Sequence, residues 1–287
     1  MEIGIGLPAT IPGVTGEELT EWARRADRTS LSSLGTIDRI VYPNYEPLVA
    51  LAAAAAVTER IRLLTSVLLM PLRLNVALFA KQTATVHHLS NRRLVLSLGL
   101  GGRDDDFDVS GADMHSRGKV FERQLDEIKR IWAGEEKGLA GPIGPNLDAP
   151  PQIIVGGSVD ASFRRAAEYG DGWIMGGGTP DQFRDGLEKL NEAWGAAGRS
   201  GKPRAMALSY YSLGADAERN ADSYLKDYYA FLGEDLAGMI AGSAAKDADT
   251  VKQYAAAFEQ AGADELIFFP SSSEPEQVDL LVDAAGI

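Results

Sequence analysis

The sequence contains no cysteine, and only three of its 287 residues are histidine. The absence of cysteine excludes disulfides, thiolate metal sites, iron–sulfur clusters and thiol nucleophiles. His87 and His88 are adjacent, so on a helix their side chains diverge by about 100° and do not face one metal ion together. Because His115 is the only other imidazole, no histidine-rich metal site is expected.

Positive charge and long hydrophobic runs are also scarce. The chain has 28 Lys and Arg residues against 41 Asp and Glu residues, a net charge of −13, so nucleic acid and anionic membrane surfaces are not expected as partners. No stretch approaches the roughly 18 apolar residues of a membrane span, and residues 1–8 lack the pattern of a secretory leader. The sequence therefore predicts a soluble, cytoplasmic protein.

Short apolar runs alternate with amphipathic runs along the chain, as in strands joined by helices. We expect strands at residues 3–7, 33–38, 61–69, 94–100, 152–155, 172–175, 204–213 and 264–269. We expect helices at residues 16–29, 47–58, 75–89, 117–133, 160–169, 180–197, 250–261 and 275–285, a surface loop at 134–151 and an extra helical segment at 216–242.

Eight strands, each followed by helical material, predict an α/β fold, a (β/α)8 TIM barrel with a helical insertion after strand 7. The barrel is expected to form a single domain that spans residues 1–287. A doubly wound open sheet is the rival architecture, because a count of strands does not show that the sheet closes.

Two well-known signatures are suggested at and just after the end of the fourth strand, and both fail. Gly99, Gly101 and Gly102 resemble the start of a dinucleotide fingerprint, but Asp104 stands where its third glycine belongs. The calcium-loop spacing of Asp104, Asp106 and Asp108 fails because Val109 replaces the required glycine and His115 replaces the closing glutamate. No metal site is predicted.

Two consecutive glycine-rich turns fall where a barrel enzyme has its active site, at the carboxyl ends of the strands. Gly156, Gly157 and Ser158 follow the fifth expected strand, and Gly176 and Gly177 follow the sixth. Each turn precedes a helix, so backbone amides and the positive end of the helix dipole face outward, which suits a phosphate. The alternative is that these glycines only let the chain turn tightly.

Four longer segments carry a more specific signal through their order and spacing. They are residues 58–71 (TERIRLLTSVLLMP), 80–101 (AKQTATVHHLSNRRLVLSLGLG), 117–134 and 150–173 (PPQIIVGGSVDASFRRAAEYGDGW). Together they resemble the bacterial luciferase-like flavin-dependent oxidoreductases, and the resemblance is weakest at 216–242. It implies a barrel that holds a reduced flavin or deazaflavin at the carboxyl ends of its strands.

The resemblance also implies roles for individual residues. The family's phosphate loop falls on the first glycine-rich turn, and the second turn lies close by. Its strand-three bulge, which contains a non-proline cis peptide behind the central flavin ring, falls on Ser66 and Val67, where the alternative is an ordinary strand end. Arg103 has the bidentate geometry to reach a phosphate, or else it neutralises the acidic residues 104–106.

Three charged residues are the catalytic candidates, and two of them depart from the family's pattern. Where many members have an acidic residue followed by histidine, this chain has Asp38 and Arg39. Arginine stays charged and cannot shuttle a proton, so Arg39 would stabilise a reduced flavin, bind an anionic substrate, or form a surface ion pair with Asp38 or Glu46. Asp106 stands where the family usually has the longer glutamate.

These features predict a flavin-dependent oxidoreductase or monooxygenase that acts on a small organic substrate. Its cofactor would be reduced FMN, used with dioxygen, or a reduced 8-hydroxy-5-deazaflavin coenzyme. A non-catalytic flavin- or deazaflavin-binding homologue for storage or sensing is the alternative, favoured by Arg39. A phosphate-binding barrel lyase or isomerase needs a lysine or glutamate inside the barrel, but the lysines considered lie on expected helices or loops: Lys81, Lys119, Lys189 and Lys202.

The resemblance further implies partners. Members of the family often pair through their second and third helices, which here predicts a homodimer with residues 52–56 and 76–79 at the interface. A flavin or deazaflavin reductase is the protein partner that such a cofactor implies. The identity of the substrate, and the choice between the two cofactors, stay open.

Overall fold

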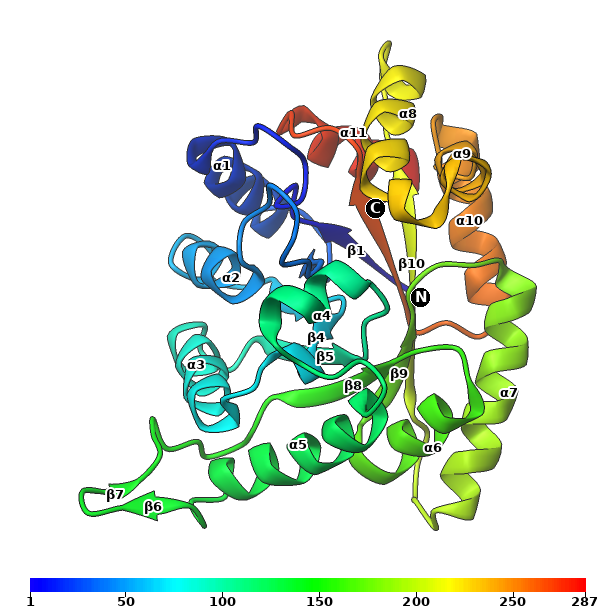
Figure 1. The fold of residues 1–287 in the computed structure, drawn as a ribbon. Helices are drawn as coiled ribbons and strands as arrows, with labels where there is room; N and C mark the ends of the chain where they lie inside the picture. The colour runs from blue at the N-terminus through cyan, green and yellow to red at the C-terminus, as the bar shows by residue number, and fades with distance from the viewer.

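The computed structural model describes residues 1–287, and its strands form a closed parallel barrel (Figure 1). The strands of the main sheet are β1 (Glu2–Gly6), β2 (Ser33–Thr36), β3 (Arg62–Thr65), β4 (Leu68–Leu69), β5 (Leu94–Gly99), β8 (Gln152–Gly156), β9 (Gly172–Met175), β10 (Arg204–Tyr211) and β11 (Glu265–Pro270). They lie in the order β3-β2-β1-β11-β10-β9-β8-β5-β4, and a pairing of β3 with β5 closes the ring. Because β3 and β4 are two halves of one interrupted strand, the predicted eight-stranded barrel is confirmed and the open sheet is wrong.

An outer layer of helices surrounds the barrel (Figure 1). These helices are α1 (Gly16–Asp27), α2 (Pro47–Ala55), α3 (Val76–Leu89), α5 (Arg117–Trp132), α6 (Asp160–Tyr169), α7 (Pro180–Ala196), α10 (Ala248–Gln260) and α11 (Glu276–Ala285). Each buries an apolar stripe on the strands, as Leu19, Trp22 and Ala26 of α1 do, which is the packing that amphipathic periodicity predicts. None of the helices has both the length and the apolar character to span a bilayer.

The predicted helical excursion after the seventh strand of the barrel is present as α8 (Ala217–Tyr228), the short 3₁₀ turn η2 (Ala230–Leu232) and α9 (Glu234–Gly242). Figure 1 shows this insertion in yellow, above the barrel, with α4 (Asp104–Ser110) in front of the barrel. The sequence analysis missed α4, because seven residues rich in aspartate carry no apolar periodicity.

Residues 134–151, expected to form only a loop, contain a small hairpin. Its strands are β6 (Lys137–Gly138) and β7 (Gly141–Pro142), and Figure 1 shows the hairpin projecting from the helical layer. Strands of two residues are too short for a period-two pattern to reveal them.

Glycines at two neighbouring strands make room for one aromatic ring in the barrel interior. A β-carbon at Gly6 would lie 2.3 Å from the ring of Phe269, and one at Gly35 would lie 2.9 Å from it. Phe269 is buried and belongs to a cluster that joins the barrel interior to the insertion. The interior is therefore packed like a protein core, and ligands must bind above it.

Candidate active site at the carboxyl ends of the strands

Asp38 follows β2 and is buried beside Arg73. Its Oδ2 accepts hydrogen bonds from the amide of Leu69 at 2.8 Å and from Arg73 Nη2 at 2.9 Å. Burial raises the pKa of the Asp38 carboxyl, and the positive charge of Arg73 opposes that rise. Asp38 thereby ties the loop after β2 to β4.

Asp106, on α4, holds the same loop from the other side. Its Oδ1 accepts the amides of Ile40 and Val41 at 2.9 and 2.8 Å, and its Oδ2 lies 3.5 Å from Arg103 Nη1. The three residues expected to be catalytic, Asp38, Arg39 and Asp106, are thus brought together around one loop.

Arg39 does not make either ion pair that the sequence suggested. Arg73 lies 3.6 Å from Glu46 and contacts Asp38, so Arg73 takes the role assigned to Arg39. Arg39 turns instead to the insertion, where its Nη1 donates to the carbonyl of Tyr228 at 2.9 Å.

Arg103 reaches the same part of the insertion, and its Nη2 donates to Tyr228 Oη at 3.2 Å. Of the two roles considered for Arg103, the ion pair with Asp106 is the one formed. No hydrogen bond joins Arg103 to either glycine-rich turn. The structure brings Arg39 and Arg103 together against one tyrosine.

The peptide bond between Ser66 and Val67 is cis, as the resemblance implied. The hydroxyl of Ser66 is buried without a hydrogen-bond partner. A β-carbon at Gly99 or at Gly156 would lie 2.7 Å from a methyl group of Val67. Glycines at the ends of β5 and β8 therefore make room for Val67 at the barrel mouth.

The turn after β8 has the features of an anion site. Gly157 has φ +138°, in the left-handed region that favours glycine, and Ser158 is exposed. The helix that follows, α6, has no side-chain cap, and Ser158 Oγ makes no hydrogen bond within the protein. Unsatisfied amides at a helix start, together with a free hydroxyl, can bind a phosphate.

The turn after β9 differs from it. Gly177 has φ +137°, but α7 begins with a capping box in which Thr179 and Gln182 satisfy each other's backbone amides. Of the two predicted turns, the one at Ser158 is thus the better phosphate site. Gly176 and Gly177 line the space next to it.

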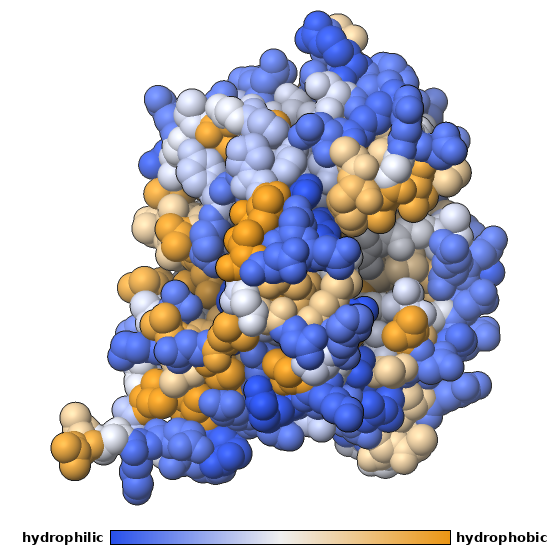
Figure 2. All heavy atoms as spheres, viewed as in Figure 1, coloured by the Kyte–Doolittle hydropathy of each residue, from blue (hydrophilic) through white to orange (hydrophobic).

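Two adjoining cavities open at these turns. The larger, about 630 Å³, lies between residues 176–180, Tyr210 and the apolar side of α9, a size typical of small-molecule sites. The smaller, about 330 Å³, includes Ser158 and shares Gly177 and Gln182 with the larger one. Figure 2 shows hydrophobic side chains gathered over α9 and a hollow in the surface beside them.

Trp173 packs in the interior and forms part of the lining of the smaller cavity, which also includes Ser158. It is buried between Phe163 and Phe183, and its indole N–H donates to the carbonyl of Gly157 at 2.6 Å. Trp173 therefore positions the turn after β8 from below.

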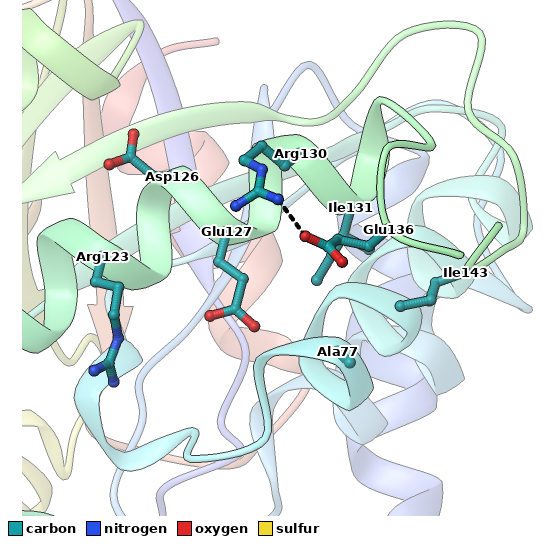
Figure 3. Close-up of a pocket in the computed structure, with 8 residues that line it drawn as sticks. All are labelled: Ala77, Arg123, Asp126, Glu127, Arg130, Ile131, Glu136 and Ile143. Carbon is teal, nitrogen blue, oxygen red and sulfur yellow. Dashed lines mark hydrogen bonds and ion pairs between the residues drawn. The ribbon is translucent and has the colours of Figure 1, made fainter. Parts of the chain in front are cut away.

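A third cavity, of about 460 Å³, lies outside the barrel between α3, α5 and the hairpin (Figure 3). Figure 3 shows Arg130 directed toward Glu136, with which it forms an ion pair. No strand end contributes to this cavity, so we assign it no catalytic role. Nowhere in the structure do three or more metal-binding side chains converge.

Sequence reasoning missed the aromatic residues of the insertion that cover the arginines. Tyr228 and Phe231 lie against both guanidinium groups, and the Tyr42 ring lies edge-on to Tyr228 with centroids 5.1 Å apart. The available signal was the aromatic density of residues 224–231 (YLKDYYAF). Nothing in the sequence showed which strand ends these rings would meet.

Comparison with known proteins identifies a family that matches nearly the whole chain. A profile of the family described as luciferase-like monooxygenase matches residues 1–278. An uncharacterized protein of Mycobacterium tuberculosis is 32% identical over 175 residues, which cover 57% of this chain and 61% of that protein. An F420-dependent glucose-6-phosphate dehydrogenase of Amycolatopsis mediterranei is 30% identical over 193 residues, 61% of this chain and 57% of that enzyme. The chain thus matches about three fifths of the length of these curated relatives.

Solved structures share the fold along nearly the whole chain. An F420-dependent secondary alcohol dehydrogenase in complex with an F420-acetone adduct aligns with a TM-score of 0.82 and 17% identity, over 99% of this chain and 98% of that one. The oxygenating constituent of 3,6-diketocamphane monooxygenase from Pseudomonas putida, in complex with FMN, aligns with a TM-score of 0.72 and 18% identity, over 98% and 96%. At these identities the likeness supports the fold alone.

Proposed function

The chain belongs to the luciferase-like monooxygenase family, and from that premise we propose that it is an oxidoreductase that uses FMN or the deazaflavin F420 on a small organic substrate. The observation that carries the proposal is the exposed turn of Gly157 and Ser158 at the uncapped start of α6. The turn lies beside a cavity at the carboxyl ends of the strands. An anionic tail anchored there would leave the rest of a cofactor at the barrel mouth.

The residues present suit such a cofactor. Ser158 Oγ and the first amides of α6 would hold the phosphate. Gly176 and Gly177 leave space beside the tail, while Ser66 and Val67 lie at the mouth of the barrel. When bound, the cofactor supplies the hydride or oxygen chemistry, and the protein supplies binding, orientation and electrostatics.

The charged residues around the loop after β2 would set the electrostatics of the site. Asp38 and Asp106 hold this loop in place through backbone amides, and Arg39 extends from it as a permanent positive charge. A fixed cation at the barrel mouth stabilises negative charge that develops during a reaction. The apolar rings of Tyr210 and Tyr229, next to the larger cavity, would limit the access of water to that site.

The test is a titration of the purified full-length protein with F420 and with FMN, each oxidised and reduced, followed by absorbance and fluorescence. The F420-dependent relative makes F420 the first cofactor to test. Saturable binding of one of them is expected, followed by turnover in a screen of alcohols, aldehydes and ketones. Binding of neither cofactor in either redox state would overturn the proposal.

A non-catalytic storage or sensing protein is the second candidate, and the observation that favours it is Arg39. Arginine cannot exchange a proton near neutral pH, so a proton-transfer step would need another group. Bound cofactor that is reduced and reoxidised without product across the substrate screen would support this candidate over the first.

We also propose a homodimer formed through α2 and α3. Val49 on α2 and Leu78 on α3 are 68% and 52% exposed, and α2 presents Ala52, Ala53 and Ala56 on the same side as Val49. Of the predicted segment 76–79, Val76 and Phe79 are buried within the chain. An apolar surface of this kind is typical of a contact between subunits.

A cytoplasmic location and a reductase that supplies reduced cofactor complete the proposal. Cell fractionation tests the location. Turnover measured with and without an added flavin reductase tests whether a reductase supplies the cofactor. Equal turnover in the two assays would contradict this part of the proposal.

A further inference from the structure

The side chains of Arg39 and Arg103 are only 9% and 12% exposed, and their guanidinium groups make few hydrogen bonds. Together they donate three, one from Arg39 and two from Arg103. The partly buried Arg93 alone donates five. The Nε atoms of both Arg39 and Arg103 are buried with no partner at all. Buried donors without partners are costly, which points to a ligand that completes the site.

Both guanidinium groups face the same two aromatic rings. The Cζ atom of Arg39 lies 5.4 Å from the ring centroid of Tyr228 and 5.5 Å from that of Phe231, and the corresponding distances for Arg103 are 5.3 and 4.7 Å. An aromatic face attracts a cation, but here it accepts none of the in-plane N–H groups. The rings therefore cover the two cations without satisfying them.

The nearby carboxylates are already engaged. Asp106 uses one oxygen for two backbone amides and lies 3.5 Å from Arg103 through the other. Asp105 accepts the amide of Asp106 and lies 3.7 Å from Arg39. Close charged pairs have contacts of about 2.7–2.9 Å, so neither carboxylate completes its arginine.

Phe231 is the least firmly held part of this cover. It is 44% exposed, and η2, on which it lies, has no buried residue. Gly233 follows directly with φ +89°, where a glycine allows the backbone to change direction. Tyr228, in contrast, is fully buried and held by both arginines.

We propose that Arg39 and Arg103 bind the carboxylate of an anionic substrate, which takes the place of Phe231 beside them. The inference rests on the proposed function, because it names the substrate class of the same site. A carboxylate is planar and matches the paired N–H groups of a guanidinium. A doubly charged phosphate would meet more repulsion from Asp105 and Asp106, and the surrounding rings favour a substrate with a flat apolar body.

The test uses the full-length protein and two probes, benzoate and its uncharged analogue benzamide, in isothermal titration calorimetry. Benzoate is expected to bind about tenfold or more tightly than benzamide, because only the anion completes both arginines. Arg39→Met and Arg103→Met should each reduce benzoate affinity about tenfold and leave benzamide unchanged. The matched control is Arg219→Met, an exposed arginine of the insertion whose removal should change neither.

Two further variants keep the proposal falsifiable if a methionine variant fails to fold. Arg39→Lys retains the charge but loses the paired geometry, and should weaken benzoate binding several-fold. Phe231→Ala removes the displaced ring and should strengthen it several-fold, whereas a purely structural role for Phe231 predicts no gain. Equal binding of benzoate and benzamide, binding of neither, or preferential binding of inorganic phosphate would overturn the proposal.

Titration of the same variants with cofactor separates this inference from the function on which it rests. Normal binding of F420 or FMN without discrimination between the probes sinks the inference and leaves the proposed function intact. Tighter binding of benzoate than of benzamide, without binding of either cofactor, overturns the proposed function and leaves the carboxylate site of the two arginines intact. If the arginine substitutions weaken only the reduced, anionic cofactor and not benzoate, the cofactor is the ligand of these arginines and the proposal is wrong.

Discussion

Replacing Ser158 with alanine should weaken cofactor binding and leave the fold unchanged. The Ser158 hydroxyl is exposed and makes no hydrogen bond within the protein, so its removal breaks no internal contact. A hydrogen bond to a charged group contributes about 1.5–3 kcal/mol, which corresponds to a dissociation constant raised roughly 10- to 150-fold. The assay is fluorescence titration with F420 and FMN, with the melting temperature measured on the same preparations.

Thr179→Ala is the matched comparison, because the Thr179 hydroxyl in the second turn already accepts the amide of Gln182 at the start of α7. Loss of that capping box should cost about 1 kcal/mol of unfolding free energy and lower the melting temperature by roughly 2 °C. Cofactor affinity should change less than threefold. If Ser158→Ala binds the cofactor as tightly as wild type while Thr179→Ala loses affinity, the phosphate lies at the second turn and our reasoning about the uncapped helix is refuted.

Three other substitutions test the fold and the assembly. Asp27 accepts three backbone amides that precede β3; burial raises its pKa, but these bonds outweigh burial and hold the pKa below its usual value. Asp27→Asn should therefore lower the free energy of unfolding, measured with urea, by about 2 kcal/mol at pH 7. The difference between the variant and the wild type should shrink below about pH 4, because protonation of Asp27 removes this contribution from the wild type. A difference that does not depend on pH would contradict this explanation. Gly6→Ala should cost about 1–3 kcal/mol by overpacking against Phe269, and Phe269→Leu in the same chain should recover part of it; an unaltered melting temperature for Gly6→Ala would show that the ring moves aside freely. Leu78→Glu should halve the mass measured by light scattering if α3 lies in a dimer interface, and a monomeric wild type would disprove the dimer.

Much of the barrel could be predicted because its strands and helices are marked locally. The strand at 172–175 and the helix at 160–169 coincide with β9 and α6. The expected strand at 61–69 is broken into β3 and β4, since an apolar run does not show where its backbone is interrupted. The resemblance, and not the periodicity, located that interruption at Ser66 and Val67.

The candidate site was predictable only in part, because its contacts join distant segments. The glycine-rich turns could be located since glycine and serine mark them directly. The sequence did not show which turn is the better phosphate site, because that depends on the capping box that Thr179 and Gln182 form at the start of α7. The ion pair considered between Asp38 and Arg39 was wrong for the same reason. The actual partner, Arg73, lies 35 residues away along the chain, and charge alone does not distinguish it from the adjacent Arg39.

The two aromatic rings that cover both arginines, Tyr228 and Phe231, come from one segment between β10 and α10. This segment can be replaced without any change to the eight barrel strands or the other loops, so natural variation or laboratory grafting can exchange it as a unit. Swapping residues 217–242 between homologues would then redirect the choice of substrate, while the turn between β8 and α6 that anchors the cofactor is inherited intact. In this architecture the segment that would set the choice of substrate and the turn that would hold the cofactor are encoded by different parts of the chain, although both border the same pair of cavities.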